Sequence, residues 1–260
     1  MKISIITVSF NSASTIRDTF ESILQQDYTD YEYIVVDGKS KDETVDIIKE
    51  YEPRFQGKMR WISEKDSGLY DAMNKGIKMA AGDVVGILNS DDFFSAPDIL
   101  STVAAGFEDP STDAIYGDVI YVRPDNLNHV IRHYSSGSFK RWKMRIGLMP
   151  AHPTFYAKKS LFDQLGLYRT DYKIAADFDL LLRFIFINRI KTAYIPKTFV
   201  TMRTGGVSTN SLKVHKQIMK EHLQSFKEAG CCTNAILLSL RYWGKIYDLL
   251  CAKVRSVLKK

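Results

Sequence analysis

An amide, a hydroxyl and two adjacent carboxylates follow one apolar run of this chain. Asn89, Ser90, Asp91 and Asp92 come directly after the run Val84–Leu88. A run of this kind is typical of a strand buried on both faces of a parallel sheet, and such sheets bind ligands at the carboxyl ends of their strands. Adjacent carboxylates there repel each other, and a hard cation such as Mg2+ or Mn2+, bound with phosphate oxygens, relieves that repulsion. A polar loop in which Asp92 caps a short turn is the alternative.

Two earlier apolar runs also end in polar side chains. These side chains are Thr7, Ser9 and Asn11 after the run 2–9, and Asp37 at the end of the run 33–37. Because the carboxyl ends of parallel strands meet at one edge, we expect all of them to lie beside Asn89. Asp37 only accepts hydrogen bonds, which suits a base imide or a ribose hydroxyl, with a cap for the next helix as the alternative. The turn 66–68 is expected to close over the same edge.

Apolar periodicity predicts the elements that position these residues. Strands over 2–9, 33–37, 59–62 and 84–88 alternate with helices over 16–24, 43–51 and 69–80. This alternation predicts an α/β fold with a doubly wound, mostly parallel sheet. Ser40 and Glu43 have the spacing of a capping box. The chain has neither G-x-G-x-x-G nor G-x-x-x-x-G-K-[ST], so a nucleotide would be held by side chains and a metal.

The second half is less regular. It predicts strands over 114–122, 153–157 and 192–202, helices over 160–165 and 177–188, a polar loop over 123–138 and two C-terminal helices. Residues 139–145 interleave basic and aromatic side chains, which fits a diphosphate clamp, a membrane contact or a solvated loop. His215 and His222 lie seven residues apart and are interpreted as surface residues.

Charge is divided unequally between the two halves. Residues 1–130 hold 12 Lys and Arg against 23 Asp and Glu, and residues 131–260 hold 24 against 7, which gives −11 and +17 within the net charge of +6. A basic half suggests a polyanionic partner: nucleic acid, an anionic membrane surface or a phosphorylated substrate. The acidic half argues against a protein that simply coats nucleic acid.

The three cysteines, Cys231, Cys232 and Cys251, fit a reducing compartment. The first residues enter a strand without a signal-peptide pattern, and no apolar run approaches the roughly 20 residues that span a bilayer. We therefore expect a cytoplasmic protein, with the inner face of the cell membrane as a candidate peripheral location.

Six segments together resemble family 2 glycosyltransferases. They are T-V-S-F-N at 7–11, V-V-D-G at 35–38, D-S-G-L-Y-D-A-M-N-K-G at 66–76, L-N-S-D-D at 88–92, H-P-T-F at 152–155 and A-D-F-D-L-L-L-R at 176–183. The likeness is strongest to bacterial enzymes of cell-surface polysaccharide assembly. It implies the GT-A fold: a catalytic domain over 1–208, with a Rossmann-like nucleotide-sugar half (1–122) and an acceptor half (123–208). Residues 209–260 would form a basic helical extension.

The resemblance implies an inverting enzyme that uses a nucleoside-diphosphate sugar, with a UDP-sugar favoured, and Mn2+ or Mg2+. The implied nucleotide-sugar ligands are Thr7, Ser9, Asn11, Asp37, Asp66, Asn74, Asn89 and Ser90, and the implied metal ligands are Asp91 and Asp92. Asn89 departs from the family pattern, because it stands where the first carboxylate of the D-x-D element usually lies. An amide can still meet the ribose or the water shell of the metal, at the expense of metal affinity.

Asp177 falls on the catalytic base of the family. This chemistry needs one carboxylate to accept a proton from the acceptor hydroxyl as its oxygen attacks the anomeric carbon opposite the leaving diphosphate. An N-terminal helix charge is the alternative for Asp177, and Asp179 is interpreted as a surface or structural carboxylate. His152 would contact the diphosphate or the acceptor, with a structural histidine as the alternative.

Residues 234–260 have an apolar face with Trp243 and an opposite basic face. This pattern suits a helix in a membrane interface or one packed on its own domain. The implied acceptor is a saccharide, free or linked to polyprenyl diphosphate.

Three other functions stay open at this stage. A non-catalytic nucleotide-sugar-binding scaffold is compatible with Asn89. A nucleic-acid-binding protein is suggested by charge alone, and no recognised motif supports it, so no nucleic-acid partner is expected. A sugar nucleotidyltransferase should carry a Gly-rich loop with Arg and Lys after the first strand, and residues 11–16 offer none.

Overall fold

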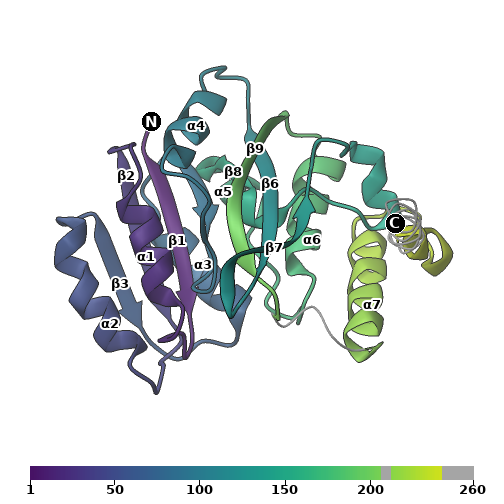
Figure 1. Ribbon diagram of the computed structural model, residues 1–260. Coiled ribbons are helices and arrows are strands. Elements are labelled where there is room, and N and C mark those ends of the chain that lie inside the picture. The colour runs from purple at the N-terminus through teal and green to yellow at the C-terminus, as the bar shows by residue number, and fades with distance from the viewer. Residues whose placement is uncertain (206–211, 242–260) are drawn as a thin grey trace, which may run out of the picture.

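The computed structural model describes residues 1–205 and 212–241, which are built around one large mixed sheet (Figure 1). Its strands are β1 (Ile3–Ser9), β2 (Tyr31–Asp37), β3 (Met59–Ser63), β4 (Val84–Ile87), β5 (Phe93–Phe94), β6 (Ala114–Arg123), β7 (Asn126–Tyr134), β8 (Tyr156–Lys158) and β9 (Thr192–Arg203). Their order is β3-β2-β1-β4-β8-β6-β9-β5, with β7 paired to β6. Strands β1 to β4 run parallel, β8 is antiparallel to β4 and β6, and β9 is parallel to β6.

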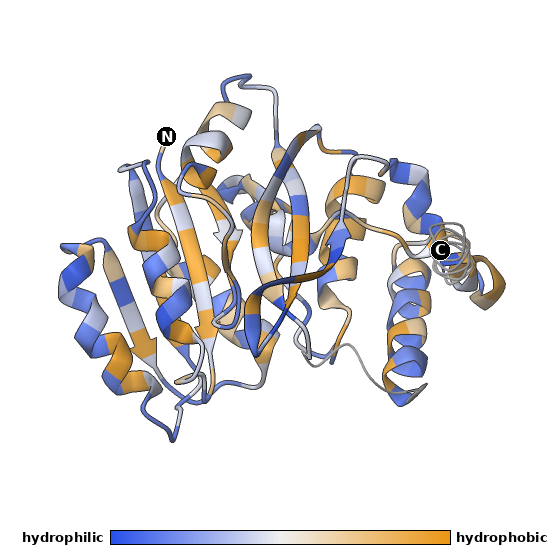
Figure 2. Cartoon of the chain, viewed as in Figure 1, coloured by the Kyte–Doolittle hydropathy of each residue, from blue (hydrophilic) through white to orange (hydrophobic). Residues whose placement is uncertain are grey.

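Helices cover both faces of this sheet. The α-helices are α1 (Ile16–Leu24), α2 (Thr44–Tyr51), α3 (Leu69–Met79), α4 (Ile99–Gly106), α5 (Lys159–Leu165), α6 (Ala176–Leu181) and α7 (Leu212–Glu228). Short 3-10 helices are η1 (Glu52–Phe55), η2 (Arg141–Ile146) and η3 (His152–Thr154), and η4 (Leu182–Ile187) is a π-helix that continues α6. Figure 2 shows the mostly apolar strand β1 and the mixed surfaces of the helices around it.

The alternation of side chains along the strands divides the interior into two cores. Ile3 and Ile5 of β1 pack with residues of α1, α2 and α4, whereas Ile6 and Val8 pack with residues of α3, α5 and α6. All four β1 side chains are almost completely buried. A parallel strand covered on both faces reads as a continuous apolar run, as residues 2–9 do.

The predicted α/β fold with a mostly parallel sheet is confirmed. Strand β1 pairs with β2 on one side and β4 on the other, so the chain changes direction of winding between them. This is the switch point at which doubly wound sheets bind ligands. The strand ends that carry the polar residues therefore converge there.

Two local predictions are wrong. The polar segment 123–138 contains the strand β7, whose side chains are mostly exposed because it pairs only with β6, so it lacks the apolar pattern of a buried strand. The expected capping box at Ser40 and Glu43 is absent: α2 begins at Thr44 without a side-chain cap. The Ser40 hydroxyl donates instead to Asp37.

Helix α7 packs onto the half of the molecule that contains α6 (Figure 1). A further helical segment over 235–241 buries Leu238 in the same core. The predicted boundary at residue 208 and residues 242–260 of the predicted amphipathic helix lie outside the described residues. Within the described part of the chain, no helix is long and apolar enough to cross a membrane.

Candidate active site

The carboxylate of Asp37 lies at the end of β2 and is surrounded by hydroxyl groups. It accepts hydrogen bonds from the hydroxyls of Ser9, Ser40 and Ser63 at 3.2, 2.5 and 2.6 Å, and from the Ser40 amide at 2.9 Å. The side chain is fully buried. The ends of β1, β2 and β3 and the loop before α2 are therefore fixed to one another through this carboxylate.

Asp66 and Asn11 lie around this edge. Asp66 lies against Gly38, where an added Cβ would be 2.5 Å from Asp66 Oδ2, so only glycine fits there without movement. Asp66 Oδ1 accepts the Gly68 amide at 2.9 Å, which closes the turn before α3. Asn11 has a left-handed backbone with φ of 50° and accepts the Lys41 amide at 2.9 Å. Asn tolerates this conformation better than most side chains.

Thr7 and Asn74 use their side chains within the protein. Thr7 Oγ1 donates to the Leu88 carbonyl at 2.7 Å and accepts the Tyr33 hydroxyl at 2.8 Å. Asn74 donates to the Tyr168 carbonyl at 2.8 Å and accepts the Tyr168 amide at 2.9 Å. The first pair joins β1 to the end of β4, and the second joins α3 to the loop before α6. In this structure both residues hold neighbouring segments together.

The turn after β4 brings Asn89, Asp91 and Asp92 together. Asp92 is fully buried, and Asn89 Nδ2 donates to its Oδ2 at 3.3 Å. The Oδ1 atoms of both residues are buried without a hydrogen-bond partner among the described residues. Burial, and then the neighbouring Asp91, raise the pKa of Asp92 well above its usual value. The Ser90 hydroxyl lies 2.8 Å from that of Ser12, which ties the turn to the loop after β1.

This donor set fits a hard divalent cation. Asp91 is only partly buried, and no hydrogen bond or ion pair to its carboxylate is present in the described part of the chain. Mg2+ prefers oxygen ligands, usually one or two carboxylates together with phosphate oxygens and water. No group of three or more His, Cys, Asp or Glu side chains that could hold a metal is present among residues 1–205 and 212–241. A cation here would therefore need oxygens from a bound diphosphate.

Arg203, at the end of β9, fixes this turn from the other half of the molecule. Its guanidinium donates to the Asp91 carbonyl at 2.5 Å and forms an ion pair with Asp18. It also lies 5.2 Å from the centre of the Phe93 ring. The backbone of Asp91 is thus held in place, while its carboxylate has no partner among residues 1–205 and 212–241.

Asp177 lies in the first turn of α6, where its Oδ1 accepts the Phe178 amide at 2.7 Å. Burial raises the pKa of Asp177, and the charge of His152 partly offsets this. His152 Nε2 lies 2.9 Å from the Tyr168 hydroxyl, and burial lowers the pKa of His152. An ionised carboxylate with a raised pKa is a stronger base, because its affinity for a proton is higher. The ideal pKa of a catalytic base lies near the working pH.

Helix α7 fixes the loop that leads to Asp177. Glu221 of α7 is almost fully buried and accepts the backbone amides of Lys173, Ile174 and Ala175 at 2.8, 3.1 and 2.7 Å. A hydrogen bond from Gln217, together with these amides, lowers the pKa of Glu221 against the opposing effect of burial. The Tyr70 hydroxyl donates to the Ile174 carbonyl at 2.5 Å from the opposite side. The three residues before α6 are therefore held from both α3 and α7.

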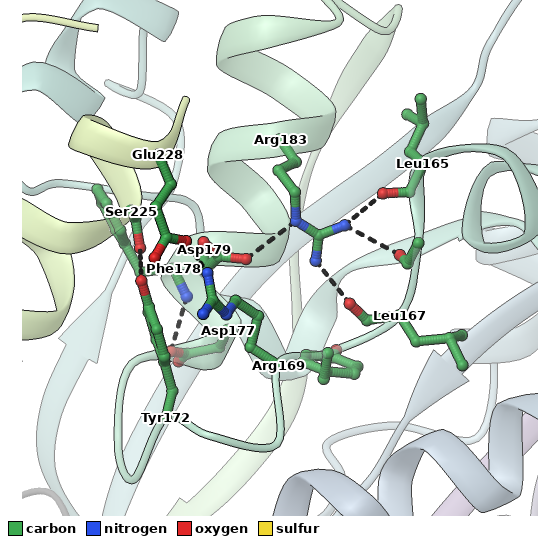
Figure 3. Close-up of polar contacts among 12 residues, drawn as sticks. Leu165, Leu167, Arg169, Tyr172, Asp177, Phe178, Asp179, Arg183, Ser225 and Glu228 are labelled. Carbon is green, nitrogen blue, oxygen red and sulfur yellow. Dashed lines mark hydrogen bonds and ion pairs between the residues drawn. The ribbon is translucent and has the colours of Figure 1, made fainter. Parts of the chain in front are cut away.

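Further polar contacts surround this loop (Figure 3). Asp179 is buried and pairs with Arg183 at 2.9 Å. Arg183 in turn donates to the carbonyls of Leu165, Gly166 and Leu167 at 2.5, 3.1 and 2.6 Å. Asp179 therefore orients Arg183, which holds the turn after α5, and this is the structural role that the sequence allows for Asp179.

The prediction that His222 is a surface residue is wrong. Its ring stacks on that of Phe178, with 3.7 Å between ring centroids, and is almost fully buried. Burial lowers its pKa to about 3, so the imidazole is neutral at neutral pH. The seven-residue spacing places His215 and His222 on the same face of α7, but at His222 that face packs against Phe178 of α6.

A family model described as "Glycosyl transferase family 2" matches residues 4–172 of the chain. The chain belongs to glycosyltransferase family 2. A PGL/p-HBAD biosynthesis glycosyltransferase of Mycobacterium bovis is 29% identical over 245 residues, which cover 94% of this chain and 91% of that protein. An uncharacterized glycosyltransferase of Mycobacterium tuberculosis is 36% identical over 184 residues, 70% and 68% of the two chains.

Solved structures agree with the GT-A fold of this family 2 glycosyltransferase. S. aureus TarS 1–349 in complex with UDP-GlcNAc matches with a TM-score of 0.70 and 19% identity over 92% of this chain and 71% of that one. This chain spans 40% of a longer TarS chain. The mannosyltransferase PcManGT of Pyrobaculum calidifontis, with GDP-Man and Mn2+, matches with a TM-score of 0.64 and 19% identity over 87% and 63%.

In this glycosyltransferase the predicted residues form two groups. Ser9, Asn11, Asp37, Asp66 and residues 89–92 lie around the ends of β1, β2 and β4, and Asp177 lies with His152. Asn74 and His152 both form hydrogen bonds with Tyr168, which links α3 to the second group. Sequence reasoning missed Tyr168, Arg203 and Glu221, whose partners lie far away in the chain. The one signal at Arg203 is its place directly after a predicted strand.

Proposed function

We propose that this glycosyltransferase transfers a sugar, with inversion, from a UDP-sugar to a hydroxyl of a saccharide acceptor. Asp177 is the base: it accepts the proton of the acceptor hydroxyl as the oxygen attacks the anomeric carbon from the side opposite the leaving diphosphate. The observation that supports this role is a partly buried carboxylate with a raised pKa, next to a loop that α3 and α7 hold in place.

The ends of β1, β2 and β4 would bind the donor. Asp37 and Asp66 would face the nucleoside, with Ser9, Asn11, Asn89 and Ser90 nearby, and Thr7 and Asn74 would support this wall from behind. Asp91, with Asp92, would hold Mn2+ or Mg2+. Such a cation neutralises charge on the leaving diphosphate. The unpartnered oxygens of Asn89 and Asp92 support a cation at this turn.

The acceptor that we propose is a saccharide linked to polyprenyl diphosphate and used in cell-surface polysaccharide synthesis. Support comes from the family resemblance, from the M. bovis relative, named for PGL/p-HBAD biosynthesis, and from the basic second half of the chain. An enzyme with such an acceptor would work at the inner face of the cell membrane.

Calorimetry of UDP and GDP binding, with and without Mn2+, tests the donor site. We expect UDP binding that depends on Mn2+ and that Asp91→Asn abolishes, because the substitution removes the unpartnered carboxylate. Asp46→Asn is the matched control, since Asp46 lies in α2 and pairs with Lys49 at the surface. Binding of UDP that is equally strong without metal would contradict the role of Asp91. A protein that binds UDP but never transfers sugar would be the scaffold considered as the alternative.

A further inference from the structure

A groove of about 580 Å³ lies at the end of the molecule formed by η2 and η4. One wall is formed by η2, through Arg141, Trp142 and Arg145. The other is formed by Phe186 and Ile187 at the end of η4 and by Arg189, two residues after it. The chain after α7 completes its wall. We call this site the basic groove. None of its lining residues belongs to the candidate active site.

Part of the positive charge around the basic groove is not neutralised by acidic side chains. The three segments that form the groove, 139–150, 182–191 and 229–241, hold eight Lys and Arg and no Asp or Glu, although Arg183 pairs with Asp179 and Lys191 with Asp109 from outside them. Among the described residues, no ion pair is formed by Arg141, Arg145 or Arg189. Arg145 lies 5.7 Å from the centre of the Phe186 ring, which holds its guanidinium in the groove. Unpaired arginines on a common surface favour a partner with phosphate groups.

Large apolar side chains are exposed beside these arginines. Trp142 is 56% exposed and Ile187 36% exposed. The helical segment 235–241 adds Ile236, which is 76% exposed, and Leu240, which is 42% exposed. The segment is held next to η2, since the Thr233 hydroxyl donates to the Arg145 carbonyl at 3.4 Å. Arginine beside exposed tryptophan and aliphatic residues is the composition of surfaces that lie in a membrane interface.

We infer that the basic groove and the exposed residues of 235–241 form a docking surface for an anionic phospholipid bilayer. The arginines would contact lipid phosphates, while Trp142, Ile187 and Ile236 would enter the region between headgroups and acyl chains. A nucleic acid fits less well, because it would leave the exposed aliphatic side chains in water, and among the described residues of this surface Trp142 alone presents a large exposed ring for base stacking. The inference does not depend on the proposed transfer reaction.

Co-sedimentation of the full chain with phosphatidylcholine vesicles, with and without phosphatidylglycerol, tests this surface. The test variant is Arg141→Gln combined with Arg189→Asn. Asparagine is chosen because Arg189 has a left-handed backbone with φ of 53°, which Asn adopts readily. Each basic residue near an anionic surface strengthens binding about fivefold, so the double variant should bind phosphatidylglycerol vesicles roughly 25-fold more weakly.

The matched control removes two charges elsewhere, through Lys49→Gln and Lys78→Gln in α2 and α3. We expect it to bind vesicles much like the wild type, because α2 lies at the opposite end of the molecule from α7 (Figure 1) and Lys78 does not line the basic groove. Equal thermal stability of both variants and the wild type would show that folding is unaffected. Trp142→Ser should weaken vesicle binding without a change in net charge.

Three results would overturn the proposal. The first is a wild-type chain that does not bind phosphatidylglycerol vesicles at low salt. The second is a groove variant that binds as tightly as the lysine control. The third is complete displacement of the protein from vesicles by glycerol phosphate at a phosphate concentration equal to that of the lipid, which would assign the groove to a soluble phosphate instead.

Discussion

Asp177 lies in surroundings that oppose its negative charge. Burial raises the pKa of its carboxyl, and His152 and the Phe178 amide lower it only in part. A carboxyl whose pKa is higher in the folded than in the unfolded protein makes folding less favourable at pH values above that pKa, because the ionised form must be buried. Catalytic groups often have this property, so removing them can stabilise a protein.

We therefore expect Asp177→Asn to raise the free energy of unfolding at neutral pH, on the order of 1 kcal/mol. The contribution of the wild-type carboxyl to stability is fully present below the ordinary pKa of 3.8 and is lost as pH rises through the raised pKa. Asparagine does not titrate, so the difference between the two proteins should grow with pH. Urea unfolding at a series of pH values measures it.

The control for this experiment is Asp171→Asn. Arg169 lowers the pKa of Asp171, so that carboxylate contributes stability above its ordinary pKa, and its removal should have the opposite sign. If Asp177→Asn and the wild type had the same free energy of unfolding at both neutral and acid pH, the raised pKa of Asp177 would be contradicted.

The residues of the site were predictable to different degrees. Asp37 and Asp91 follow apolar runs directly, so their place at the edge of the sheet follows from strand ends in the sequence. The sequence does not reveal that Thr7 and Asn74 are occupied by protein partners, because Leu88 and Tyr168 lie 81 and 94 residues away from them. Hydrogen bonds of this range depend on the finished fold.

At the level of elements, α7 is the one whose role the sequence does not indicate. Its apolar and polar positions predict a helix, and a basic helix near the C-terminus favours a surface location. In the structure Glu221 holds three consecutive amides before α6, and the Ser225 hydroxyl donates to that of Tyr172 at 3.1 Å. Helix α7 is thus part of the support for Asp177.

Glu221→Ala should lower the free energy of unfolding by about 2–5 kcal/mol, because three buried amides lose their acceptor. It should also reduce kcat more than it weakens UDP binding, since the loop that carries the base is released while the ends of β1 and β2 are unchanged. Steady-state turnover assays measure the change in kcat, and calorimetry measures the change in UDP affinity.

Glu228→Ala on the same helix is the matched control, because Glu228 is 44% exposed and pairs with Arg169 at the surface. Surface ion pairs contribute at most about 1 kcal/mol. If Glu221→Ala and Glu228→Ala reduced kcat to the same extent, Glu221 would have no special part in positioning Asp177.

At the scale of the whole molecule, the two halves differ in charge and in how regular they are. The first half, with its βα repeats, is predictable because each buried strand is followed by an amphipathic helix. In the second half β7 was missed, since its side chains are mostly in water, and helix 177–188 was predicted without its change to a π-helix at Leu182. Long-range pairing of β6 with β8 and β9 also leaves no local pattern.

The charge division agrees with a site between two halves. The acidic first half contains Asp37, Asp66, Asp91 and Asp92, which would repel a diphosphate unless a cation lies between them. The basic second half contributes Arg203 to this turn and the basic groove at the far end. The acidic first half thus favours binding of a nucleoside-diphosphate sugar together with a metal, and the basic second half favours contact with an anionic surface.

The central claim is that Asp177 is the base of a sugar transfer, and its most direct test separates turnover from binding. UDP release from a UDP-sugar, in the presence of a polyprenyl-linked saccharide and Mn2+, would be compared for the wild type and Asp177→Asn, with UDP affinity measured by calorimetry. We predict that turnover falls by about 10²–10⁴-fold while UDP affinity is unchanged. Wild-type turnover in Asp177→Asn would contradict the account.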